Sequence, residues 1–144
     1  MLRRVSSASA RGVAFIEFAA MLPLLLVLAL GAVDLGRGLI SYVELEQAAQ
    51  EGALYGSFAP SDHSLVTARV RDSSTGLVDL ADATEVDVEV QCPPDVPAGK
   101  IGIRVSFTLD VFTPLVGPLL GGSLPLEARS VGTNFTDATC DPTP

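Results

Sequence analysis

Glu17 is the residue whose type and position most suggest chemistry, because it is the only charged side chain between Val13 and Val33. A carboxylate at the centre of a bilayer is disfavoured by about 2.5–3.5 kcal/mol, and by less toward the headgroups. Three interpretations follow: a solvated headgroup position, an incidental charge in an ordinary secretory signal, or a functional ionisable group. The third is favoured by the Gly-x-x-x-x-Glu-Phe spacing of Gly12, Glu17 and Phe18 ahead of the apolar core.

The remaining reactive side chains do not form a recognisable catalytic or metal-binding set. His63 is the single histidine, and it follows Asp62 at an expected helix start, where a capping or exposed role is favoured over acid–base chemistry. Cys92 and Cys140 are widely spaced, and one histidine with two distant cysteines offers too few ligands for a metal site. We therefore expect no enzyme activity, no catalytic residue, no cofactor and no metal.

The apolar run is long enough to cross a bilayer, which needs about 20 such residues in a helix. An ordinary cleavable signal is the rival interpretation, but its apolar core is usually shorter, and here the helical pattern continues to Pro60. We divide the chain into a basic leader at 1–12, a transmembrane helix at 13–33, an extra-membrane continuation of that helix at 34–58 and a small exported α+β domain at 59–144.

The distribution of charge predicts the orientation in the membrane. Three of the nine basic residues lie before Gly12, whereas all 17 acidic residues follow it. The positive-inside tendency therefore places the N-terminus in the cytoplasm and the C-terminal domain on the far side of the inner (cytoplasmic) membrane. An exported part this acidic has no basic patch for nucleic acid. In the oxidising compartment outside the membrane, we expect Cys92 and Cys140 to form a disulfide.

The exported part reads as a short helix followed by strands. The helix is expected from His63 to Ser73, and strands at 85–90, 101–111 and about 124–135. The first two strands are expected to pair as an antiparallel hairpin, which would place Arg104 among the carboxylates of Asp87 and Glu89. In the third strand the apolar parity shifts between Ala128 and Val131, which predicts a bulge or twist.

Two features leave a choice between packing within the chain and contact with a partner. A stripe of small residues on the long helix favours the protein's own domain over another subunit; it comprises Ala48, Ala49, Gly52, Ala53 and Gly56. An apolar loop at 112–122 is expected to tuck over the sheet or the first helix, with the membrane or a partner as alternatives. The loop residues predicted to be covered are Leu115, Val116, Leu119 and Leu120.

The first 58 residues resemble the TadE-like family, minor pseudopilins of the tight-adherence pilus. The shared pattern is a basic leader, a glycine, Glu-Phe after four residues, an apolar run with proline, a glycine-rich exit and a Glu-Gly-Ala helix end. In this sequence the matching segments are Arg11-Gly12, Glu17-Phe18, Leu22-Pro23-Leu24, Gly31-Ala32-Val33-Asp34-Leu35-Gly36-Arg37 and Gln50-Glu51-Gly52-Ala53. The later strands are similar to the family's soluble part only in pattern.

The resemblance implies a pilin-like α+β fold, with a long N-terminal helix whose first half is in the membrane, a short second helix and a small three-stranded antiparallel sheet. It also implies a non-enzymatic pilus subunit that a prepilin peptidase cuts between Gly12 and Val13. Glu17 would then pair with the new amino terminus of a neighbouring subunit. The expected partners are the membrane, the peptidase, other pilin or pseudopilin subunits and the assembly machinery. The alternative is an exported binding domain on a single-span anchor, without a pilus role.

Overall fold

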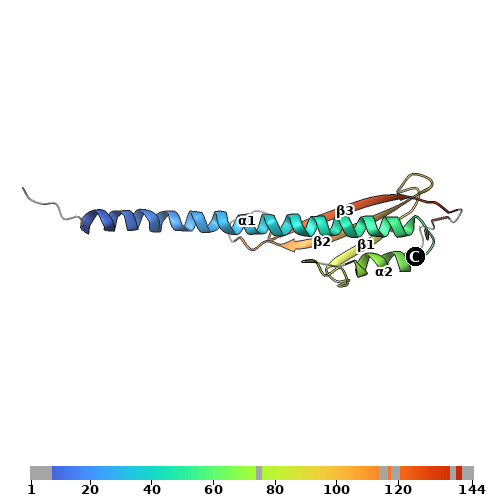
Figure 1. The fold of residues 1–144 in the computed structure, drawn as a ribbon, viewed down its shortest axis with the longest axis horizontal. Coiled ribbons are helices and arrows are strands. Elements are labelled where there is room, and N and C mark those ends of the chain that lie inside the picture. Colours follow the sequence, from blue (N-terminus) through green and yellow to red (C-terminus); the bar gives the residue numbers. More distant parts are fainter. Residues whose placement is uncertain (1–7, 74–75, 114–116, 118–120, 137–138, 141–144) are drawn as a thin grey trace, which may run out of the picture.

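The computed structural model describes residues 8–73, 76–113, 117, 121–136 and 139–140, with side chains from Gly12 onward. Two helices precede a three-stranded antiparallel sheet, so the α+β prediction is confirmed. Figure 1 shows a long rod-shaped helix whose first part projects away from a small domain. That domain is formed by the sheet, the second helix and the later part of the long helix.

Helix α1 runs from Ala8 to Gly56 and contains 49 residues, which corresponds to a length of about 74 Å at 1.5 Å per residue. It continues through Pro23. Proline lacks the N–H for one helix hydrogen bond, and its ring crowds the preceding turn. Membrane helices tolerate this when neighbouring groups satisfy the freed carbonyl. The helix ends two residues before the sequence predicts. Its last turn tightens there, because the Phe58 backbone N–H donates to the Tyr55 carbonyl, three residues back, at 3.0 Å.

Helix α2 spans His63–Asp72, and Asp62 is its N-cap residue. The Asp62 side chain accepts the backbone N–H of Leu65 at 3.0 Å, which satisfies one of the donors left free in the first turn. The apolar face of α2 buries Val66 and Val70 in the core. The expected short helix is therefore present, and Asp62 caps it, as the Ser61-Asp62 pair before the helix indicates.

The sheet is ordered β1-β2-β3, with both pairs antiparallel. Strand β1 spans Val86–Gln91, β2 spans Lys100–Asp110 and β3 spans Ser123–Thr133. The predicted hairpin is thus correct, and Arg104 lies opposite Glu89 with Nη1 and Oε2 3.3 Å apart. Its second acidic neighbour is Glu127 of β3, 3.0 Å from Nε, instead of the expected Asp87. Asp87 faces Ser106 in the register.

Of the bulge or twist predicted in the third strand, the bulge is wrong. The pairing of β2 with β3 runs from Lys100↔Thr133 to Asp110↔Ser123 without an extra residue. A Cβ at Gly132 would collide with the carbonyl oxygen of Ala53, so the position that faces α1 needs glycine, while Val131 is left exposed on the other face. The shift of apolar parity reflects this close approach of helix and strand, and not a change of register.

The core lies between the later part of α1, α2 and one face of the sheet. Buried small residues of α1 (Ala48, Ala49 and Ala53) contact buried strand residues there, which resolves the stripe in favour of the protein's own domain. A Cβ at Gly52 would collide with Val70 and press on Ile103. Close contact between helix and sheet therefore depends on the missing side chain.

Strand β2 runs antiparallel to α1, and this direction determines which end of the strand lies near the projecting half of the helix. A Cβ at Gly38 would lie 3.5 Å from Leu109, near the end of β2, and one at Gly56 would lie 2.8 Å from Ile101, near its start. The end of β2 is therefore on the side of the projecting half of α1 (Figure 1). The loop residues predicted to be covered, Leu115, Val116, Leu119 and Leu120, lie outside the described residues.

Candidate functional site

Gly12, Val13 and Glu17 all lie in the first turns of α1 and are exposed. A Cβ at Gly12 would meet no atom within 4 Å, so the backbone at this position is open to an approaching protein. Glu17 follows Val13 by four residues, which places the two on the same side of the helix one turn apart. Helix geometry thus places the Glu17 carboxylate about one turn from the Gly12–Val13 bond, where the resemblance implies cleavage.

The helix between Val13 and Val33 presents apolar side chains on all sides, with none of them buried by the described part of the chain. This segment belongs to the one helix, among the described residues, that is long and apolar enough to cross a membrane. Exposed large side chains in it are Val13, Phe15, Ile16, Phe18, Met21, Leu22, Leu24, Leu25, Leu26, Leu28, Leu30 and Val33. A soluble monomer rarely exposes so large an apolar surface, so it requires lipid or protein contact.

Asp34, the first residue after this segment, fastens the β2–β3 connection to α1. Its carboxylate accepts the backbone N–H of Phe112 at 3.3 Å and that of Thr113 at 2.8 Å, and it also accepts the Thr113 hydroxyl. The Thr113 hydroxyl is the main cause of a lowered pKa of Asp34, with smaller lowering effects from the two N–H groups and Arg37, against a partial opposing effect of desolvation. Asp34 is therefore held as a carboxylate.

Arg37 completes this contact from the next turn of the helix. Its guanidinium carbon lies 4.5 Å from the centroid of the Phe112 ring, within the range of a cation–π interaction. The backbone of Phe112 is fixed by Asp34, and its ring is covered on one face by Arg37, yet the side chain remains 67% exposed. The exit of the long helix and the connection between two strands thus form one structural unit.

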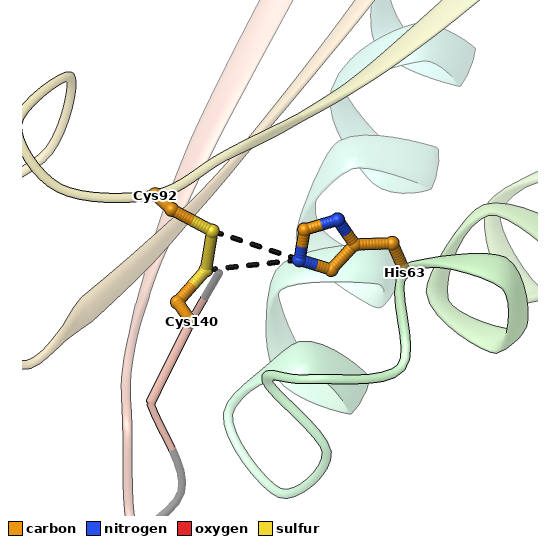
Figure 2. The surroundings of a disulfide bond; sticks show 3 residues. All are labelled: His63, Cys92 and Cys140. Atoms are coloured by element: carbon orange, nitrogen blue, oxygen red, sulfur yellow. Dashed lines mark hydrogen bonds between the residues drawn. A yellow bond between two sulfur atoms is a disulfide. The ribbon is translucent and has the colours of Figure 1, made fainter. Parts of the chain in front are cut away.

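The predicted disulfide between Cys92 and Cys140 is present at the opposite end of the domain. It ties the residue that follows β1 to the C-terminal tail, with the two Cα atoms 5.4 Å apart. Figure 2 shows the His63 ring directed at both sulfur atoms, with Nε2 3.6 Å from the Sγ of Cys92 and 4.0 Å from that of Cys140. His63 is half-buried against the disulfide and not in the capping or exposed role expected of it.

These three side chains resemble a metal-binding cluster in spacing only. Their donor atoms lie within 4.8 Å of one another. Zinc and related metals bind the thiolate form of cysteine, however, and both sulfur atoms here are joined in the disulfide. Neither sulfur is therefore available as a thiolate ligand in this structure.

The match to known proteins covers α1. Residues 12–54 match the TadE-like family. The matched segment begins at Gly12, includes Asp34 and Arg37, and ends two residues before the helix does. No curated protein and no solved structure matches the chain. The TadE-like match indicates a role connected with tight-adherence pili, and the apolar helix is consistent with a single-pass membrane anchor.

Two carboxylates have structural roles that the sequence analysis did not identify. Asp34 was recognised only as part of the exit motif, although it bonds to Thr113, 79 residues later. Glu44 accepts the backbone N–H groups of Leu77 and Val78, both at 2.9 Å, and so fastens the segment after α2 to α1. Spacing in the sequence does not reveal the bonding partner of either carboxylate, since both partners lie more than 30 residues away.

Proposed function

We propose that this protein is a minor pilin or pseudopilin, a structural subunit for assembly of a tight-adherence, type IV-like pilus. The observation that supports this role is the position of the TadE-like match on the fold. The match starts at Gly12 and covers the helix whose apolar surface has no partner among the described residues. A subunit with such a helix needs lipid before assembly and the helices of other subunits after it.

Processing after Gly12 by a prepilin peptidase is the first step of the proposed mechanism. The Gly12–Val13 bond lies in the first turns of α1, where the helix has few tertiary contacts and can open at low free-energy cost. Glycine presents no side chain between the peptidase and this bond. Cleavage removes the basic leader and creates a positively charged amino terminus on Val13.

Glu17 acts at the next step, assembly. A carboxylate inside an apolar helix is unfavourable alone, but becomes tolerable when paired with a cation. By analogy with pilin families, the partner is the amine of Val13 on a neighbouring subunit, so the charge pair forms as the helix leaves the lipid. This role is structural and needs no catalytic residue.

The proposed location follows from the same arrangement. Before assembly the subunit spans the inner membrane once, with the leader in the cytoplasm and the disulfide-containing domain outside. Its partners are the prepilin peptidase, other pilin or pseudopilin subunits and the assembly machinery.

Intact-mass measurement of the protein extracted from membranes of a host that makes the pilus tests the proposal. Loss of residues 1–12 is the expected result. A full-length chain with no cut at Gly12, in a host whose other pilins are processed, would favour the alternative of an exported binding domain on a simple anchor.

A further inference from the structure

We infer that the turn at Val111–Thr113 rests on the outer surface of the lipid bilayer, with the Phe112 ring inserted at the boundary between headgroups and acyl chains. The exported domain then contacts the membrane at a second point beside α1. This inference rests on the membrane-spanning part of the proposed function. It adds a lipid-binding surface on the domain itself.

The position of the turn follows from its bonds to Asp34. Phe112 and Thr113 donate backbone N–H groups to a carboxylate on the first residue after the apolar segment. The turn therefore has the same height above the membrane as residue 34 of α1. An error of one helical turn in the end of the span would move the Phe112 turn by about 5.4 Å. Because the headgroup layer has a comparable thickness, the turn would still lie at or next to it.

The chemistry of the turn suits this position. Phe112 is a large apolar side chain that is 67% exposed although its backbone is fixed. Leu35 and Leu39, in the first two turns of α1 beyond the span, are exposed as well. Aromatic and leucine side chains are favoured where a protein enters the bilayer surface. Arg37 is the only basic residue between Gly12 and Arg69, and it places a positive charge over the Phe112 ring, where lipid phosphates are found.

Phe112 and Phe135 are equally exposed but lie at different distances from the membrane-spanning segment. Phe135 is 68% exposed, nearly the same as Phe112, but it lies at the far end of the domain, beside Phe58 at a ring distance of 5.7 Å. The far end is about 30 Å from residue 34 along α1, as given by the helical rise. Of these two equally exposed rings, the one at Phe112 is at the height of the membrane surface and the one at Phe135 is not.

Tryptophan fluorescence in lipid vesicles tests the inference, because the chain has no native tryptophan. Three full-length variants each carry one probe: Phe112→Trp for the turn, Phe135→Trp as the equally exposed distant control and Leu26→Trp as a marker within the span. Each is reconstituted in vesicles of phosphatidylcholine with a minor share of phosphatidylglycerol. Quenching is measured with acrylamide from water and with lipids brominated either near the headgroup or near the chain end.

The expected result differs for each probe. The probe at position 112 should be quenched by shallow brominated lipid and about twofold less by acrylamide than the probe at 135. The probe at 26 should be quenched best by deeply brominated lipid. Adding Asp34→Ala to the Phe112→Trp chain should reduce lipid quenching and increase acrylamide quenching, because the turn is no longer held to α1. Asp110→Ala, an exposed acid at the end of β2, should leave both unchanged.

The same data distinguish the ways in which the inference can be wrong. A deep probe at 26 with a probe at 112 as open to acrylamide as that at 135 would overturn the inference and leave the span intact. A probe at 112 shielded from acrylamide but not quenched by brominated lipid would indicate protein contact instead, such as a second copy of the chain. A probe at 26 that no brominated lipid quenches would instead disprove the membrane span itself.

Discussion

The carboxylate of Asp34 accepts both the backbone N–H and the hydroxyl of Thr113, a residue 79 positions later in the chain. This contact joins the exit of the apolar helix to the connection between β2 and β3. It gives a physical role to an acidic residue of the TadE-like segment that would otherwise appear to be a simple end of the membrane span.

The contact predicts a specific dependence of stability on pH. The pKa of Asp34 in the folded protein is lowered from the ordinary value of 3.8, mainly by the Thr113 hydroxyl. A lowered folded-state pKa adds stability that is complete above the unfolded pKa and is lost as the pH falls through the folded one. Asp34→Asn should therefore be less stable than the parent at neutral pH, and the difference should shrink below pH 3.8.

Thermal unfolding of the detergent-solubilised chain, followed by circular dichroism across this pH range, measures the effect. Asp110→Asn is the matched control, since Asp110 is exposed at the end of β2, and it should follow the parent curve. Asp62 and Asp82 also have lowered pKa values, from hydrogen bonds to Leu65 and Thr84 respectively, so some acid dependence remains in every variant. Equal pH dependence in Asp34→Asn and the parent would contradict the prediction.

Gly52→Ala should destabilise the domain by about 1–3 kcal/mol, because the added Cβ collides with Val70 and presses on Ile103 in a closely packed core. Gly36→Ala is the same substitution in the same helix, at a position where a Cβ meets nothing within 4 Å. It should be neutral, or stabilising by up to about 1 kcal/mol through helix propensity. Chemical denaturation measures the free energy of unfolding, which should fall for Gly52→Ala and should stay equal or rise for Gly36→Ala. A fall in both variants would show that helix–sheet contact is not the cause.

Loss of the disulfide should destabilise the domain by about 4 kcal/mol at most, as the loop-entropy relation gives for two cysteines 48 residues apart. Cys92→Ser with Cys140→Ser removes the bridge without leaving a reactive thiol, and denaturation then measures the difference from the oxidised parent. Thiol labelling of the unreduced exported protein should find no reactive cysteine. Two labelled thiols per chain would refute the bridge.

Gly12→Val should leave a membrane-inserted chain of full length that cannot be matured, because a branched side chain obstructs the approach of the peptidase to the backbone. Mass measurement of the extracted protein checks this. The open surroundings of Gly12 mean that the substitution should not disturb the folded domain. A chain shortened after residue 12 in this variant would exclude the proposed processing requirement.

Glu17→Ala should insert at least as well as the parent, since an unfavourable charge is removed from the apolar helix, yet it should not support pilus assembly. Glu17→Asp should be intermediate, because the charge remains but its reach is shorter. Fibres are scored by microscopy in a host that makes the pilus, with Gly12→Val beside them. Normal fibres from both Gly12→Val and Glu17→Ala would leave the simple membrane anchor as the better account.

The sequence by itself determined those features that depend on local pattern. The alternation of valine with acidic residues from Val86 to Val90 predicted β1 and its exposed face, and the structure agrees to within one residue. The uninterrupted helical pattern up to Pro60 predicted α1. The pairing of Cys92 with Cys140 followed because these are the only two cysteines. The limits of domains, the cleavage site and the role of Glu17 remain predictions.

Only the tertiary structure decided how distant segments meet. Gly132 interrupts the apolar alternation of β3, which from the sequence alone resembles a shift of strand parity. In the structure, this position has no room for a side chain because the carbonyl of Ala53 lies against it. The sequence favoured a capping or exposed role for His63, whereas the fold places its ring beside the disulfide. The partner of Asp34 could not be read from spacing, because a carboxylate on a helix can accept any N–H that the chain brings to it. Which N–H arrives is decided by the docking of β2 along α1, where missing side chains at Gly52 and Gly56 allow close contact.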